Sequence, residues 1–157
     1  LSRKMMETAG MFNRYNRLIN QDVLYSLLPA DKQMLWMVRN ELPKQTKQKS
    51  GAPPNLLPLF LASVNWQNAA HRTEAHRVLA ECARPSNLAI IVDLLSHKFA
   101  DYTVRSFAVD CLRDIKDDDV LRQYLLQLTQ CLKAEPQHNS LTATFLLERN
   151  TNSKLCR

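Results

Sequence analysis

The sequence is poor in glycine, with only Gly10 and Gly51 among its 157 residues. Hairpin turns and phosphate-binding loops depend on glycine, so its scarcity argues against a strand-rich fold and against a Gly-rich nucleotide site. No apolar run approaches the roughly 18–20 residues that a membrane span requires. The N-terminus also lacks the continuous apolar segment of a signal peptide. The chain does not start with Met, so we expect a segment of a longer protein.

The familiar catalytic motifs are missing as well. The sequence has no G-x-S-x-G, no H-E-x-x-H, and neither of the kinase motifs H-R-D and D-F-G. The acidic run 117–119 favours helix-end stabilisation over metal binding, and His71 and His76 are wrongly spaced to share one helix face. We expect no catalytic, cofactor-binding or metal-binding residues. Reduced thiols are predicted for the four widely spaced cysteines, Cys82, Cys111, Cys131 and Cys156.

Positive charge is concentrated in the first third of the chain. The formal net charge is +6, and residues 1–50 hold nine Lys or Arg against four acids. A loop is predicted over residues 44–54, with Lys44, Lys47 and Lys49 on it. The loop is interpreted as solvated, with contact to anionic lipid as the alternative. No basic stripe with exposed aromatics is evident, so no nucleic-acid partner is expected.

Apolar residues recur with helical spacing along most of the chain. After Asp101, a good N-cap, the spacing predicts one apolar stripe, with Arg105 left for water. From Asp117 to Pro136 it predicts a single helix whose opposite face carries glutamines. Further helices are predicted over residues 2–18, 30–41, 55–63, 68–83, 86–96 and 139–149. The predicted core residues are Trp36, Trp66, Val104, Phe107, Cys111, Leu121, Tyr124, Leu125 and Leu128.

Three predicted helix pairs begin near residues 55, 86 and 117. The spacing of 31 residues is typical of a two-helix repeat. Short amphipathic helices are marginal alone and are stabilised by packing on neighbours. We therefore expect an all-α fold, a HEAT-like α-solenoid of antiparallel helix pairs.

Five sequence blocks resemble the helical accessory domain of phosphoinositide 3-kinases. Residues 35–39 are similar to that family's L-W-x-x-R, and residues 57–66 to its L-P-x-x-L-x-S-V-x-W. Residues 94–112 are similar to L-L-x-x-x-F-x-D-x-x-V-R-x-F-A-V-x-C-L. Residues 117–136 resemble the family's D-D-D-L-L helix, and residues 140–149 its S-A-L-A-R-F-L-L-x-R. The blocks follow the family's order.

The resemblance implies a non-catalytic scaffold within a phosphatidylinositol 3-kinase. It divides the chain into an N-terminal helix and linker (1–29), the accessory domain (30–150) and a divergent tail (151–157). The expected partners are the other domains of the same kinase chain and a candidate regulatory subunit. The parent enzyme is expected to be cytoplasmic, and membrane contact is expected only through it. The candidate interdomain or partner surface comprises Asp31, Arg39, Arg105, Gln123 and Gln127.

One departure from the family concerns the regulatory subunit. In class I relatives an acidic patch before the L-W helix meets a phosphotyrosine-binding domain. Here residues 26–31 retain only Asp31, which argues against inhibition by such a subunit. Two alternatives stay open, the helical domain of a phosphatidylinositol 4-kinase and a free-standing α-solenoid adaptor.

Overall fold

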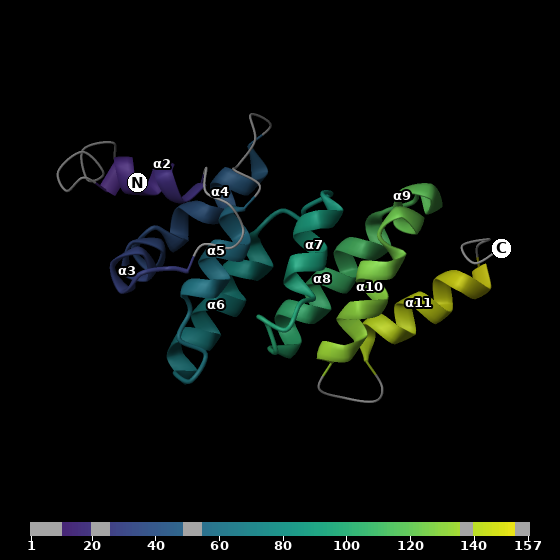
Figure 1. Ribbon diagram of the computed structural model, residues 1–157. Helices are drawn as coiled ribbons and strands as arrows, with labels where there is room; N and C mark the ends of the chain where they lie inside the picture. Colours follow the sequence, from purple (N-terminus) through teal and green to yellow (C-terminus); the bar gives the residue numbers. More distant parts are fainter. Residues whose placement is uncertain (1–10, 20–25, 49–54, 136–139, 153–157) are drawn as a thin grey trace. The chain divides into compact units, whose positions relative to one another are not determined.

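The computed structural model describes residues 11–19, 26–48, 55–135 and 140–152, and these contain helices and no strands (Figure 1). The chain forms two compact units, residues 1–83 and 84–157. The all-helical prediction is therefore confirmed for the described residues. The expected first helix lies partly outside them, as do residues 153–157 of the tail.

Unit 1 contains five α-helices and one 3-10 turn among its described residues. Helix α2 packs on α3, α3 packs on α5, and α4 packs on α6. Fully buried apolar side chains from three of these helices, Leu18, Leu35 and Phe60, belong to the core. The bounds are α2 (Met11–Ile19), α3 (Pro29–Met37), η1 (Arg39–Glu41), α4 (Leu42–Lys47), α5 (Leu56–Ser63) and α6 (Ala69–Glu81).

Unit 2 is organised around α8, which packs on both α7 and α11, while α10 packs on α7. Its core includes Ile91, Leu94 and Leu112, none of which is exposed. The bounds are α7 (Leu88–Leu94), α8 (Tyr102–Asp114), α9 (Asp118–Gln123), α10 (Leu125–Cys131), η2 (Leu132–Ala134) and α11 (Leu141–Asn152).

Side-chain caps fix where four of the helices begin. Asn68, Asn87, Asp101 and Asp117 each accept a hydrogen bond from a backbone N–H in the first turn of the helix that follows. Such caps satisfy donors that the helix itself cannot pair. The cap predicted at Asp101 is confirmed. Asp117 caps α9, which agrees with the helix-end interpretation of the acidic run 117–119.

Two of the predicted elements are wrong. Residues 44–47 belong to α4 and not to a loop, because Pro43 is tolerated in a first helical turn and both Leu42 and Pro43 are buried. The predicted single helix after Asp117 is interrupted at Tyr124, whose backbone (φ −104°, ψ 5°) is not helical. No glycine or proline marks this interruption, so periodicity alone could not reveal it.

Candidate interaction surfaces

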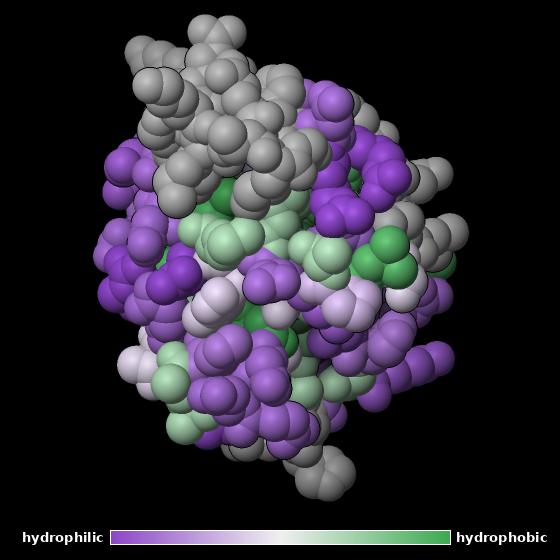
Figure 2. All heavy atoms as spheres, turned by 90° about the vertical axis from the view of Figure 1, so that its left-hand side faces the viewer, coloured by the Kyte–Doolittle hydropathy of each residue, from purple (hydrophilic) through white to green (hydrophobic). Residues whose placement is uncertain are grey.

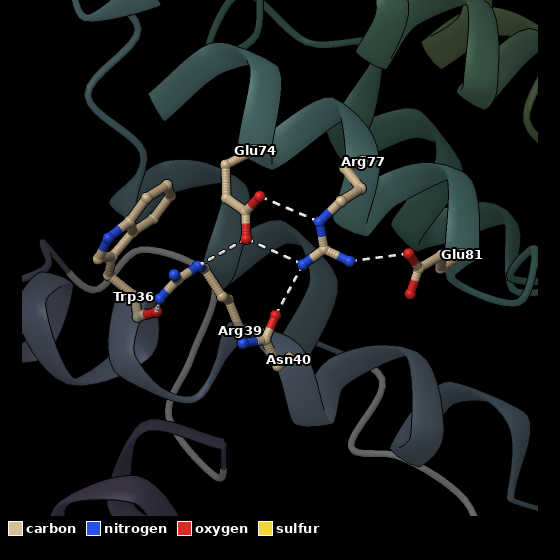
Figure 3. A network of polar contacts seen from close by, with 6 residues as sticks. All are labelled: Trp36, Arg39, Asn40, Glu74, Arg77 and Glu81. Carbon is tan, nitrogen blue, oxygen red and sulfur yellow. Dashed lines mark hydrogen bonds and ion pairs between the residues drawn. The ribbon is translucent and has the colours of Figure 1, made fainter. Parts of the chain in front are cut away.

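A polar network joins η1 to α6 in unit 1 and includes the predicted surface residue Arg39 (Figure 3). The Arg39 guanidinium donates to Glu74 Oε1 at 3.0 Å and to the Trp36 carbonyl oxygen at 2.8 Å. Arg77 donates to both carboxylate oxygens of Glu74, at 2.9 and 3.0 Å, and to Asn40 Oδ1 at 2.7 Å. Glu74 therefore lies between two guanidinium groups that belong to different elements.

These hydrogen bonds change the acidity of Glu74. They lower its pKa from 4.5 to about 2, with Arg77 contributing more than Arg39. Arg77 also pairs with Glu81 at 2.7 Å, so the network runs along the exposed side of α6. Its charges are largely neutralised within unit 1. Arg39 is thus engaged in holding η1 against α6.

The Trp36 indole ring lies in a stack beside this network. Its centroid is 4.2 Å from the His71 ring, at an interplanar angle of 9°, and 6.3 Å from the Phe60 ring. The Arg39 guanidinium carbon lies 4.8 Å from the centroid, a cation–π distance. Trp36 therefore links α3 to α5 and α6 while staying partly exposed.

The cysteines of the described chain are poor nucleophiles. Cys82, Cys111 and Cys131 are free and buried. Burial raises the pKa of Cys82 to about 11 and that of Cys111 to about 12. Their thiols stay protonated near neutral pH, whereas nucleophilic attack needs the thiolate. Within the described ranges, no group of three His, Cys, Asp or Glu could hold a metal ion.

A comparison with family models identifies the protein family of this chain. The accessory domain of the phosphoinositide 3-kinase family (PIK domain) matches residues 3–156. The chain belongs to this family. The parent family inferred from the five sequence blocks is thereby confirmed.

Relatives of this PIK domain come from Dictyostelium discoideum. Phosphatidylinositol 3-kinase 2 is 33% identical over 141 residues, which is 90% of this chain and 7% of the relative. Phosphatidylinositol 3-kinase 3 is 33% identical over 144 residues, or 90% of this chain and 8% of the relative. Phosphatidylinositol 3-kinase 1 is 40% identical over 96 residues, which is 61% of this chain and 6% of the relative. The chain thus spans less than a tenth of each of these relatives.

Two predicted surface residues of the PIK domain are buried, and for them the prediction is wrong. Asp31 is fully buried. Its Oδ2 atom accepts a hydrogen bond from the backbone N–H of Leu28 at 3.1 Å, and its Oδ1 atom lies 3.2 Å from Arg14 Nε. A short carboxylate in a first helical turn pairs readily with the backbone donors there. Asp31 therefore does not give residues 26–31 an acidic surface.

Arg105 is the second predicted surface residue that is buried, with 3% of its side chain exposed. Its guanidinium donates to Glu135 Oε1 at 2.7 Å and to the carbonyl oxygens of Ser96 and Phe99 at 3.2 and 3.0 Å. The Thr142 hydroxyl donates to the same Glu135 oxygen at 2.5 Å. These contacts tie α8 to the residues before α8 and after α10. The pairing joins residues 30 apart in sequence, so no local motif could have revealed it.

The buried face of α8 explains why Arg105 is inside. The predicted stripe ran through Val104 and Phe107, but α8 packs on two neighbours and its buried face is wider. Val109 and Arg105 lie on that face, while Phe107 is at its edge and partly exposed. Val104 stays buried, so the predicted face is widened by about one position, or 100° on a helix, towards Arg105 and Val109.

The other predicted core residues divide into two groups. Val104, Cys111, Leu121 and Leu128 are buried. Trp66 is partly exposed at the turn after α5, where its indole N–H donates to the Leu61 carbonyl. Tyr124 and Leu125 are also partly exposed, and the helix break at Tyr124 interrupts the predicted stripe at this point.

The predicted glutamines face solvent. Gln123 and Gln127 are exposed, as is Gln130. Within α10, positions 126, 127 and 130 share one face, and Gln123 is exposed at the end of α9, just before the break. Leu126 lies among these glutamines with 67% exposure. We call these four residues the glutamine face.

Proposed function

We propose that this PIK domain is a non-catalytic scaffold that positions the other parts of a phosphatidylinositol 3-kinase. The observation that carries the proposal is the family match over residues 3–156. The two relatives that cover 90% of this chain are named phosphatidylinositol 3-kinases and are more than ten times its length. Lipid phosphorylation would therefore belong to another part of the parent protein.

The glutamine face is the surface we propose for contact with a neighbouring domain. It carries no charge, and the exposed Leu126 supplies an apolar centre. Interfaces between parts of one protein combine apolar centres with polar rims in this way. Arg39 is a weaker candidate, since its guanidinium already binds Glu74 and the Trp36 carbonyl.

We also propose that the helix pairs stack as a short HEAT-like solenoid. Helices α5, α7 and α9 begin at residues 56, 88 and 118, close to the expected spacing of 31. A compact globule of this length has a radius of gyration of about 15 Å. Small-angle X-ray scattering should give a larger value if the pairs stack in a row, and a value of about 15 Å would contradict the stacking.

The proposed partners are the other domains of the same kinase chain, in the cytoplasm. A regulatory subunit remains a candidate, but residues 26–31 offer it no acidic contact because Asp31 is buried. No helix of the described residues is long and apolar enough to cross a membrane. For the parent enzyme we propose peripheral binding to the membrane that holds its lipid.

The test uses the native protein that contains this chain. It is immunoprecipitated and supplied with phosphatidylinositol and ATP, and the position of the new phosphate is determined. We expect the 3-phosphate. The 4-phosphate would indicate the helical domain of a 4-kinase instead. No phosphorylation, together with a native polypeptide near 18.1 kDa, would indicate a free-standing adaptor and would contradict the proposal.

A further inference from the structure

The outer side of α10 carries a large apolar side chain that is mostly exposed. Leu126 is 67% exposed. The buried residues of this helix, Leu128 and Cys131, lie about 140–160° around it from Leu126. The Cys131 thiol donates to the carbonyl oxygen of Val92 in α7 at 3.8 Å, so the buried side of α10 is the side that meets α7. Leu126 therefore lies on the side of α10 away from α7.

Helix α11 repeats this arrangement. Leu147 is also 67% exposed. Thr142 and Phe145 are buried, and they too lie about 140–160° around the helix from the exposed leucine. Because α11 packs on α8, its buried side is turned toward α8. Leu147 therefore lies on the side of α11 away from α8.

Hydrogen bonds at both ends align α11 with α9 and α10. Arg149, near the end of α11, donates to Asp118 at the start of α9, at 2.8 Å. Thr142, near the start of α11, donates to Glu135 just after η2, at 2.5 Å. Helix α11 therefore runs antiparallel to α9 and α10 and beside them (Figure 1). Since α7 packs on α8 and on α10, and α8 packs on α11, the two exposed leucines share one side of the α10–α11 pair.

Three exposed threonines lie near these leucines, three or four residues from one of them along its helix. Each threonine hydroxyl already donates to a backbone carbonyl oxygen of its own helix, at 2.7, 3.0 and 2.9 Å. Burying such a threonine leaves its donor bonded, so the cost of removing it from water is small. The outer face of the α10–α11 pair, as we call it, consists of Leu126, Thr129, Thr144, Leu147 and Thr151.

The surroundings of the outer face hold little free charge. The residues three and four positions from Leu147, at 143, 144, 150 and 151, are all uncharged. Glu148 pairs with Arg113 of α8 at 3.6 Å, which directs its charge toward the inner side of the pair. On α9, Arg122 pairs with Asp119 at 3.1 Å. A partner on the outer face therefore meets apolar groups and threonines whose hydroxyls are already bonded.

The exposed apolar side chains of unit 1 have different surroundings. The large ones among its described residues are Leu28 and Met37. Figure 2 looks onto unit 1 from the side of α3 and shows hydrophobic residues separated by hydrophilic ones. The uncharged outer face of unit 2 is thus the better candidate for an apolar partner.

We propose that the outer face of the α10–α11 pair binds an apolar helix of the parent protein, from a part of it outside residues 1–157. The inner side of the pair already packs on helices, α7 and α8. A further helix fits there because the side-chain ridges of one helix fill the grooves of another. An uncharged face favours an uncharged partner, since burying an unpaired charge is costly.

The relatives that cover 90% of this chain are more than ten times its length, which leaves ample sequence to supply such a helix. The inference rests on the proposed scaffold function and deepens it. It extends the proposed contact from the glutamine face to α11, and it names the partner as helical and apolar.

The experiment is photo-cross-linking in the full-length parent protein. A diazirine analogue of leucine replaces Leu147, and in a second preparation it replaces Tyr102, which is 65% exposed on α8. After irradiation and digestion, mass spectrometry identifies the captured peptides. Position 147 should capture a peptide of the same polypeptide, from outside residues 1–157, whose apolar residues recur with helical spacing. Position 102 should not capture that peptide.

The other occupants of the face give different results. Mixing isotopically labelled and unlabelled protein reveals a second copy, because cross-links then join a light peptide to a heavy one. Capture of a second copy, of a different polypeptide, or of no peptide at all would each overturn the proposal.

A variant on the other helix tests whether the two leucines belong to one interface. In protein that carries the analogue at position 147, Leu126→Asp should lower the yield of the cross-link at least about tenfold, because a charge would then be buried against the apolar helix. Tyr102→Asp is the matched control and should leave the yield unchanged. Circular dichroism should be unchanged in both variants, since both side chains are exposed. An unchanged yield in Leu126→Asp would overturn the shared interface.

The scaffold proposal is tested separately by the position of the phosphate that the native protein adds. Formation of the 3-phosphate without a captured helix would overturn this interface alone. A captured helix without formation of the 3-phosphate would support the interface and contradict the proposed function.

Discussion

The Arg105 guanidinium lies 2.7 Å from the Glu135 carboxylate, and only 3% and 7% of the two side chains are exposed. Two backbone carbonyls and the Thr142 hydroxyl complete the cluster. A buried ion pair of this kind contributes little if both partners are exchanged for apolar residues, but it is costly to break on one side. The cluster joins four segments of unit 2, namely residues 96–99, α8, Glu135 and α11.

Replacing Arg105 alone should therefore be strongly destabilising. In Arg105→Ala the Glu135 carboxylate stays buried without its cation, which should lower the free energy of unfolding by about 3–5 kcal/mol. Urea denaturation followed by circular dichroism measures the change. Arg113→Ala, an exposed arginine on the same helix, is the control and should change stability by no more than about 0.5 kcal/mol. Similar losses in both variants would contradict the buried pair.

Glu74 should make stability depend on pH in the acid range. Its pKa is lower in the folded chain (about 2) than the usual 4.5, so the unfolded chain binds a proton first as the pH falls. The contribution of Glu74 to the stability of the folded chain is complete above about pH 4.5 and is lost as the pH falls from about 4.5 to about 2. Because Glu74 is solvent-accessible, the loss should not exceed about 1 kcal/mol. Thermal melts of Glu74→Gln should show a shallower acid decline than the parent. The exposed Glu148→Gln should not.

Truncation of Phe60 and of Phe107 should lower stability by different amounts, because the first side chain is fully buried and the second is partly exposed. Phe60 has no exposed surface and stacks near Trp36, so Phe60→Ala should cost about 3–5 kcal/mol. Phe107 lies at the edge of the buried face of α8, so Phe107→Ala should cost clearly less. Chemical denaturation of the two variants checks the order. A larger loss in Phe107→Ala would contradict the partial exposure of Phe107 on α8.

The buried thiols should react only when the chain opens. In a Cys156→Ser variant, the remaining thiols are Cys82, Cys111 and Cys131, all buried with raised pKa values. Labelling by a thiol-specific disulfide reagent at neutral pH should be orders of magnitude slower in buffer than in concentrated urea. Rapid labelling in buffer would show that at least one thiol is accessible.

Local signals predicted the fold well. Apolar spacing placed most helices, Asp101 marked the start of α8, and the motif blocks identified the family. The failures concern features that apolar spacing does not register. Residues 44–47 are helical because α4 packs on α6, and the break at Tyr124 has no glycine or proline to announce it.

The candidate surfaces were harder to predict than the core. A charged residue was expected to face solvent, yet Asp31 and Arg105 are buried by partners distant in sequence or by backbone groups. Gln123 and Gln127 are exposed, as helical periodicity predicted.

The most direct test of the scaffold proposal combines two readouts on the double variant Gln123→Arg/Gln127→Arg in the native protein. These side chains are exposed, so the unfolding curve of the 157-residue chain should be unchanged. Phosphorylation of phosphatidylinositol by the native protein should fall, because a neighbouring domain no longer binds the glutamine face. Unchanged lipid phosphorylation with unchanged stability would contradict the account.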